Sequence, residues 1–222
     1  MTVLFLCLTL ANARTDVTNQ YLQNADLKSL VKWNYGDDGY NYTDWKKDGS
    51  VPVIEFYHTW SENPGTPIGD TCNFHLTQAA NLPAGDYRLV INAFYREGKG
   101  DGTSKAVIMA GTQEKAIRGL LEGEIADFSG SSALYRAATA FSQGYFPNYI
   151  DFTVDEEQEV TLGISGFIDT YDSWCILGPV RLYQYETGEE KTAEEDPVIP
   201  TKYVTYSSFC RVRPHSNADF HK

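Results

Sequence analysis

The stretch from Leu82 to Arg96 constrains the fold more strongly than any other part of this chain of 222 residues. It opens with a turn, because Pro83 presets its own φ and Gly85 adds conformational freedom. The residues after the turn alternate between two faces of a strand, with Tyr87, Leu89, Ile91 and Ala93 on one face and Arg88, Val90, Asn92 and Phe94 on the other. Because both faces carry apolar groups, we predict a central strand that is partly covered on both sides.

Further strands are predicted where short runs alternate between apolar and polar residues. These runs cover 53–60, 72–77, 104–110, 150–154, 160–164 and 174–185. The acidic turn Asp155–Gln158 is predicted to join two of them as a hairpin, and Gly178-Pro179 predicts a bulge or an edge in the last one. Residues 33–50 mix aromatic side chains with Gly, Asn and Asp, which is typical of a loop.

The segment from Thr112 to Gly144 departs from this strand rhythm. Alanines and Phe141 recur at helical spacing over residues 133–143, Ser131-Ser132 can cap the start, and Gly144 suits the position after the end. One short helix is therefore predicted to cross between strands. Many short strands, Gly/Pro turns and a single helix together predict an all-β fold, a β-sandwich of two sheets with jelly-roll topology.

The two ends of the chain differ in character from the predicted domain, which covers residues 14–186. Val3–Leu10 is an apolar run followed by Ala11-Asn12-Ala13, so residues 1–13 are interpreted as the remnant of a secretory signal peptide cut after Ala13. Residues 187–222 are interpreted as an acidic linker and the truncated start of a following region. We therefore expect an exported protein (secreted, periplasmic or on the cell surface) with covalently linked further domains.

The charge and the aromatic content narrow the choice of partners. A net charge of −12 disfavours nucleic acid and anionic membrane surfaces, because both need a basic face. The apolar run 3–10 is too short to span a bilayer as a helix, so no membrane insertion is predicted. Fifteen tyrosines suit a neutral polar ligand such as a sugar, although tyrosine also simply fits pleated sheets.

The cysteines leave two interpretations open. Four are present, and Cys7 lies in the predicted signal peptide, which leaves three and therefore an odd count. Cys72 and Cys175 both fall in predicted strands, where they form either a disulfide across neighbouring strands or two buried free thiols. No Cys/His cluster has the spacing of metal ligands, so no metal site is predicted.

Several motifs between Asp16 and Tyr185 carry a resemblance to a known family. They are Asp16-Val17-Thr18 with Tyr21–Asp26, Leu82–Arg88 with Ala93–Arg96, Ala140-Phe141 leading to Gly144–Asn148, and Leu162-Gly163-Ile164 with Trp174 and Arg181-Leu182-Tyr183. This run, about three quarters of the chain, resembles the galactose-binding-like, carbohydrate-binding-module-like β-sandwich domains of secreted Bacteroidetes proteins. The resemblance implies a jelly roll that binds a carbohydrate ligand within a larger protein.

The resemblance also implies that loops at one end of the sheets hold the sugar. There an aromatic ring packs on the C–H surface of the sugar, and polar side chains bind its hydroxyls. The candidate ligand-binding residues are Trp60, Arg96, Tyr145, Asn148, Trp33 and Tyr171. Trp60 is the preferred stacking residue, with rim packing as its alternative. A buried ion pair is the alternative for Arg96, and a turn role is the alternative for Tyr145 and Asn148.

Three functions follow in order of preference. The first is a noncatalytic carbohydrate-binding module of an exported multidomain bacterial protein. The second is a structural or protein-adhesion β-sandwich without a sugar site, and the third is a glycan-acting hydrolase. We expect no enzyme and assign no catalytic residue, because nothing fixes a pair of carboxylates at glycosidase separation. No cofactor is expected, and a structural calcium ion stays open, because Leu177-Gly178-Pro179 stands where many relatives carry Asp-Asn-Phe.

Overall fold

The computed structural model describes residues 14–37, 41–46, 51–58, 67–96, 105–128, 133–170 and 173–186. Its strands are β1 (Arg14–Asp16), β2 (Asn34–Asp37), β3 (Asn41–Lys46), β4 (Val53–His58), β5 (Pro67–Leu82), β6 (Gly85–Arg96), β7 (Lys105–Ala110), β8 (Gln113–Ala116), β9 (Pro147–Val154), β10 (Gln158–Thr170) and β11 (Trp174–Tyr185). Its helices are α1 (Thr18–Tyr21), α2 (Glu122–Ile125), the 3-10 helix η1 (Ala126–Phe128) and α3 (Ala133–Ser142). None of the helices in these ranges is long and apolar enough to cross a membrane.

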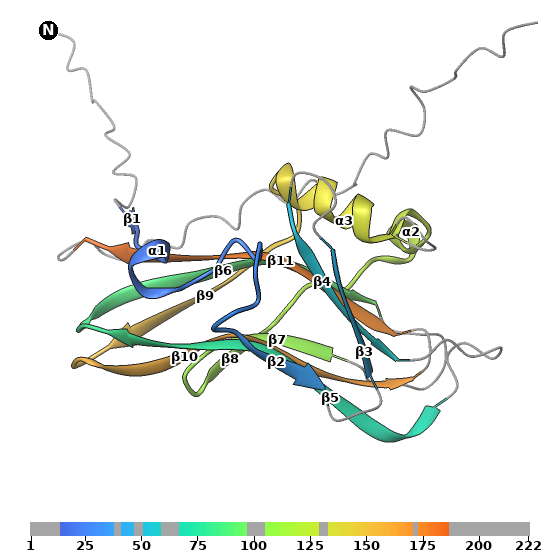
Figure 1. The fold of residues 1–222 in the computed structure, drawn as a ribbon, viewed down its shortest axis with the longest axis horizontal. Helices are drawn as coiled ribbons and strands as arrows, with labels where there is room; N and C mark the ends of the chain where they lie inside the picture. The colour runs from blue at the N-terminus through green and yellow to red at the C-terminus, as the bar shows by residue number, and fades with distance from the viewer. Residues whose placement is uncertain are drawn as a thin grey trace, which may run out of the picture.

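The strands form two antiparallel sheets that pack face to face (Figure 1). The first sheet has the order β3-β4-β11-β6-β9, with β1 added beside β11, and the second has the order β2-β5-β10-β7-β8. The eight strands from β4 to β11 can be numbered one to eight along the chain. The order in the first sheet is then one, eight, three, six (β4-β11-β6-β9), and the order in the second sheet is two, seven, four, five (β5-β10-β7-β8). This is the strand order of a jelly roll, so the predicted all-β fold and topology are confirmed.

Strand β6 is central, as predicted, and lies between β11 and β9. One of its faces points between the sheets, where Tyr87, Leu89, Ile91 and Ala93 are all at most 1% exposed. On this face the Tyr87 ring stacks on Phe152 of β9 with ring centres 5.5 Å apart. The main core is therefore the apolar layer between the two sheets, which holds side chains from both of them.

A second core covers part of the outer face of the first sheet. Helices α2 and α3 lie on this side of the sandwich (Figure 1), and apolar side chains of η1 and α3 pack around Phe94 of β6. The Phe94 ring lies 4.7–5.7 Å, centre to centre, from the rings of Phe128, Phe141, Phe146 and Trp174. Trp174 thus belongs to the core, and Phe94 joins β6 to the helices.

The predicted helix over residues 133–143 is confirmed as α3, and Gly144 follows it with a φ of +81°. The bulge predicted at Gly178-Pro179 is also confirmed, because the pairing of β11 with β6 shifts between Leu177 and Val180. A Cβ on Gly178 would lie 2.6 Å from Cδ2 of Phe141, so the absent side chain lets α3 approach β11 closely.

Two other predictions are wrong. Residues 34–37 and 41–46, interpreted as loop, form the edge strands β2 and β3. The turn Asp155–Gln158 does not close a hairpin, because β9 pairs with β6 in the first sheet while β10 pairs with β5 and β7 in the second. The turn instead carries the chain across the sandwich. Of the two interpretations left open for Cys72 and Cys175, the disulfide is excluded, because Cys175 is a buried free thiol and the two residues lie on strands of different sheets.

Replacing Phe94 with Ala is expected to lower the free energy of unfolding by about 3–5 kcal/mol, because the ring is fully buried against four other rings. Urea denaturation measures this change. Tyr135→Ala on α3 is the control, because Tyr135 is 61% exposed, and it should change stability by less than about 0.5 kcal/mol. Equal losses in the two variants would contradict the assignment of Phe94 to a second core.

Stability is expected to fall between about pH 10 and pH 12. Burial raises the pKa of Tyr87 to about 12, and burial followed by the nearby charge of Asp151 raises the pKa of Tyr185 to about 12. Both values lie above the ordinary pKa of 10.0, so the stabilisation is complete below pH 10 and is lost as the pH rises through 12. Thermal melts across this pH range should show that the melting temperature falls less steeply with pH in Tyr87→Phe than in Tyr135→Phe. Parallel curves would refute the contribution of Tyr87.

Candidate functional site

A groove with a volume of about 200 Å³ lies at one edge of the sandwich. It is formed where β8, the edge strand of the second sheet, approaches β9, the edge strand of the first. Its lining residues are Lys115, Ala116, Ile117, Arg118, Pro147, Asn148 and Tyr149. We call this feature the edge groove.

Asn148 holds the two sides of the edge groove together. Strand β9 begins at Pro147, and beyond that point the segment 118–120 replaces it beside β6. There the Tyr95 N–H donates to the Arg118 carbonyl at 3.2 Å, and the Leu120 N–H donates to the Tyr95 carbonyl at 2.8 Å. The Asn148 side chain lies where the two segments meet.

Every polar atom of the Asn148 amide is used by the backbone. Its Nδ2 donates to the carbonyl oxygens of Ile91, Ala93 and Phe146 at 3.3, 2.7 and 3.0 Å. Its Oδ1 accepts the N–H of Arg118 at 2.8 Å. Asn148 is 8% exposed. These bonds to the backbone give the Asn148 amide a structural role inside β9 and argue against the predicted binding of sugar hydroxyls by this side chain.

Arg118 places a guanidinium group at the edge groove. Its Nη2 donates to both carboxylate oxygens of Glu124, at 2.8 and 3.0 Å, and its guanidinium carbon lies 4.8 Å from the centre of the Phe146 ring. The Leu121 N–H donates to the same carboxylate at 2.9 Å, which fixes Glu124. The Nη1 atom of Arg118 is buried without a hydrogen-bond partner. Orphaned donors of this kind are rare in folded proteins.

Lys115 and Tyr149 form the open side of the groove. The Lys115 ammonium lies 3.9 Å from the centre of the Tyr149 ring. Across the described ranges, no carboxylate lies within ion-pair distance of this ammonium. The guanidinium carbon of Arg88 lies 4.2 Å from the same ring centre, so Tyr149 has two cations beside it.

An ion pair fixes Arg88 beneath this surface. Its Nε and Nη2 donate to the two carboxylate oxygens of Asp151 at 2.7 and 2.8 Å, and the Tyr185 hydroxyl donates to Asp151 at 3.0 Å. The Arg88 side chain is only 6% exposed. Because planar bidentate pairs hold both partners in one orientation, Arg88 is fixed beside the Tyr149 ring.

The chemistry of the edge groove is that of a binding surface. Its lining contains two cations, apolar and aromatic groups, and no carboxylate. It therefore lacks the carboxylate pair that a glycosidase needs. Within the described residues no group of three His, Cys, Asp or Glu could hold a metal ion.

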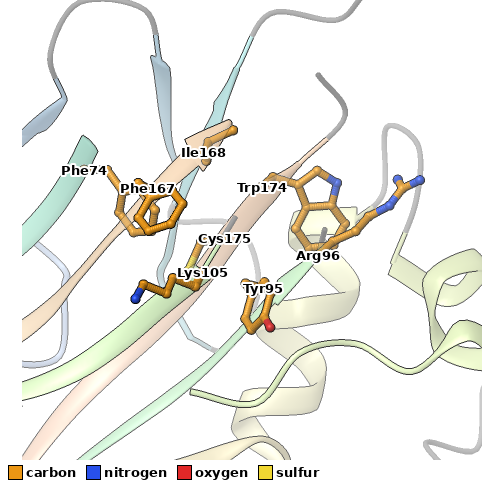
Figure 2. Close-up of a pocket in the computed structure, with 8 residues that line it drawn as sticks. All are labelled: Phe74, Tyr95, Arg96, Lys105, Phe167, Ile168, Trp174 and Cys175. Carbon is orange, nitrogen blue, oxygen red and sulfur yellow. The ribbon is translucent and has the colours of Figure 1, made fainter. Parts of the chain in front are cut away.

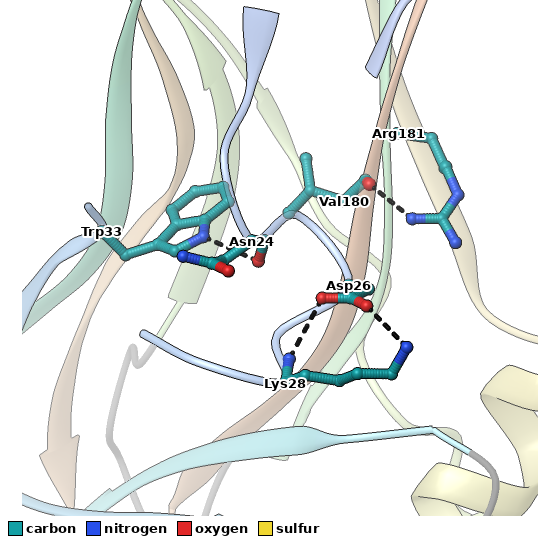
Figure 3. Close-up of polar contacts among 6 residues, drawn as sticks. All are labelled: Asn24, Asp26, Lys28, Trp33, Val180 and Arg181. Carbon is teal, nitrogen blue, oxygen red and sulfur yellow. Dashed lines mark hydrogen bonds and ion pairs between the residues drawn. The ribbon is translucent and has the colours of Figure 1, made fainter. Parts of the chain in front are cut away.

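The described residues also do not fit a structural calcium ion at the place that the resemblance implies. Leu177-Gly178-Pro179 supplies no carboxylate there. In the nearby loop, the Asp26 carboxylate is 2.9 Å from the Lys28 ammonium (Figure 3). The hydrogen bond from Lys28 lowers the pKa of Asp26. The carbonyl of Ala25 accepts the Val180 N–H at 2.8 Å, so the protein's own donors occupy this loop.

Trp33 and Arg96 are buried, which argues against the predicted contact of these two side chains with a sugar at an open loop end. The Trp33 indole N–H donates to the Asn24 carbonyl at 3.0 Å, and its ring packs between the sheets (Figure 3). Arg96 is 8% exposed, and its guanidinium carbon lies 5.9 Å from the centre of the Trp174 ring. Figure 2 shows Arg96 and Trp174 at one end of a closely packed region. This region has no room for a water molecule.

Tyr145 is half-buried and packs against the helix-covered core. Its carbonyl accepts a hydrogen bond from Asn92 at 2.8 Å, which agrees with its turn alternative. Trp60 and Tyr171 lie outside the described residues, so their predicted roles stay predictions. The structure therefore does not bring the described candidates together in one open site.

The sequence analysis missed Lys115, Arg118 and Tyr149. Strand β8 was not predicted, because its residues Gln113–Ala116 are all exposed and show no apolar alternation. One signal was present: Gly111-Thr112 separates β7 from β8 by two residues, with a φ of +60° at Gly111. Two-residue turns with glycine are typical of hairpins and would have located the second wall of the groove.

No family model matches the sequence, and no curated protein matches it. The structure is similar to that of TmCBM61 in complex with beta-1,4-galactotriose, with a TM-score of 0.43, 13% identity and coverage of 74% of this chain and 97% of that chain. It is also similar to the CBM22-1 xylan-binding domain of Xyn10C from Paenibacillus barcinonensis, with a TM-score of 0.37, 5% identity and coverage of 73% and 91%.

A further similar structure is the enzymatically active domain of tailspike protein 4 from bacteriophage CBA120, with a TM-score of 0.38, 11% identity and coverage of 73% of this chain and 21% of that chain. At these TM-scores and identities, the likenesses indicate neither a ligand nor a site for this chain. Its function has to be inferred from its own residues.

Replacing Asn148 with Ala is expected to lower the free energy of unfolding by about 1–3 kcal/mol, because the backbone groups it satisfies would be left without partners. Chemical denaturation measures the loss. Asn81→Ala is the matched control, because Asn81 makes an exposed hydrogen bond to Glu157, and it should change stability by less than about 0.5 kcal/mol. Unchanged stability in Asn148→Ala would contradict the structural role.

Proposed function

We propose that this chain is a noncatalytic carbohydrate-binding module and that the edge groove is its binding site. The observation that supports this is the groove itself, which combines hydrogen-bond donors, an aromatic side chain and a lining free of carboxylates. The sequence resemblance over Asp16–Tyr185 supports the same function independently. Pockets that enclose a whole drug-sized ligand measure about 300–1,000 Å³, so the smaller edge groove suits one unit of a longer glycan.

Each part of the groove has a role in this proposal. Pro147 and Tyr149 supply an apolar wall for the C–H surface of a sugar, and Lys115 and Arg118 supply donors for its oxygen atoms. The Arg88–Asp151 pair keeps the wall in place before the ligand arrives, which limits the entropy lost on binding.

A shallow site of this kind binds weakly, with dissociation constants from millimolar to micromolar, or about 4–8 kcal/mol. Tethering to other domains of an exported bacterial protein would raise the effective affinity, because it raises the local concentration of the module near its glycan. Secretion, further domains and placement outside the cytoplasm are parts of this proposal.

A second candidate function is a structural or protein-adhesion domain without a sugar site. One observation favours it: the described aromatic candidates are used within the fold, with Trp33 buried and Tyr145 packed against the helix-covered core. Under this alternative the edge groove binds no glycan, and the same experiment separates the two functions.

The test is a glycan-array screen of the full chain, with Tyr149→Ala, Trp60→Ala and the exposed control Tyr135→Ala beside it. We expect a glycan signal that falls at least tenfold in Tyr149→Ala and is kept in Tyr135→Ala. Circular dichroism establishes that each variant is folded.

Other outcomes have defined meanings. A signal lost only in Trp60→Ala would move the site to the loop end and refute the edge groove. A blank array with folded protein would refute sugar binding and favour the adhesion alternative.

A further inference from the structure

We infer that the edge groove prefers saccharides that carry an anionic group, a carboxylate or a sulfate, over neutral ones. Lys115 and Arg118 are the residues that would bind this group. The inference rests on the proposed function, because it names the class of sugar that the same site takes.

The charge of the groove differs from that of the chain. The chain has 30 acidic against 18 Lys and Arg residues, yet the groove lining has two cations and no acid. An acid-rich protein offers a surface lysine many possible partners. The described residues nevertheless leave the Lys115 ammonium without a carboxylate, held over the Tyr149 ring at 3.9 Å. The groove therefore presents a cation whose position is set by an aromatic ring rather than by an ion pair.

Arg118 adds a second donor whose capacity is incompletely used. Glu124, itself 6% exposed, occupies Nη2 and neutralises one unit of charge, while Nη1 has no partner. The Arg118 side chain is 19% exposed and is one of the residues that line the groove. Because Nη1 is buried, a ligand in the groove would meet the charge of the Arg118 guanidinium rather than bind this atom. That charge favours an anionic oxygen over a hydroxyl.

The surroundings favour an anion over a cation or a neutral group. Glu124 is paired with Arg118, so among the described residues the uncompensated charge at the groove is that of Lys115. Arg88 lies 4.2 Å from the same Tyr149 ring, but it is paired with Asp151. A neutral sugar hydroxyl can accept from Lys115, but it gains none of the charge–charge attraction.

The experiment compares matched ligands that differ only in the anionic group. Oligogalacturonate is compared with its carboxyl-reduced neutral form, and a sulfated glycan with its desulfated form, by calorimetry or biolayer interferometry at about 0.15 M salt, where the Debye length is about 8 Å. We expect the full chain to bind at least one anionic ligand about five- to tenfold more tightly than its neutral counterpart. The pair that shows the preference distinguishes carboxylate from sulfate.

Variants test whether Lys115 is responsible. Lys115→Gln should abolish the preference, so that the anionic and the neutral form bind with equal affinity, because it removes the charge and keeps a donor. Lys115→Arg should restore most of the preference. Lys32→Gln is the control, because Lys32 is an exposed lysine outside the groove, and it should behave as the unmodified chain does.

Three results would overturn the inference. Equal binding of anionic and neutral ligands would refute the preference and leave the proposed function intact. A preference reduced equally in Lys32→Gln and Lys115→Gln would show general charge attraction rather than a site. No binding of any ligand by folded protein would refute the proposed function together with the inference.

Discussion

Strand β6 carries apolar side chains on both faces, so the inner face and the apolar part of the outer face have to be buried by different parts of the chain. The inner face is covered by the second sheet, which is the ordinary solution for a β-sandwich. The outer face is covered near Phe94 by α3 and η1, whose side chains make up most of the second core. Fully burying a phenylalanine contributes about 1.5–3 kcal/mol, so the helices are stabilised by the strand they cover.

The helical cover ends partway along β6, and the edge groove lies beside that boundary. On one side Phe94 is buried under helices; farther along the same face Arg88 forms a bidentate pair with Asp151. Phe146 marks the boundary, with a φ of +59° that bulky residues rarely adopt. Its ring packs on Phe94, and its carbonyl accepts the Ala93 N–H and the Asn148 amide. This packing outweighs about 1–3 kcal/mol of backbone strain and fixes where the groove begins.

The sequence was most informative where apolar residues alternate, because the period of two reports burial directly. It predicted both faces of β6, the helix α3 and the bulge in β11. It could not predict which strands pair, since the turn Asp155–Gln158 has the same composition whether it closes a hairpin or crosses between sheets. The correct jelly-roll topology came from the resemblance and from the number of strands rather than from that turn.

The binding residues were harder to predict than the fold for a physical reason. Aromatic and amide side chains serve a ligand or the protein itself, and only the structure shows which groups are already hydrogen-bonded. Trp33 and Asn148 have the composition of a sugar site, yet their polar atoms bind the protein's own backbone. Lys115 and Arg118 lie in a polar stretch with no apolar pattern, where sequence periodicity carries no information.

The net charge of −12 does not prevent the edge groove from binding an anion. At 4 Å and an effective dielectric constant of 20, one cation attracts an anion by about 4 kcal/mol before desolvation, and exposed pairs retain up to about 1 kcal/mol of this. A negative charge 20 Å away repels by roughly 0.2 kcal/mol in water, and screening at physiological salt lowers that more than tenfold. Even twelve such charges then oppose binding by roughly 0.2 kcal/mol, so the nearest cation decides the preference.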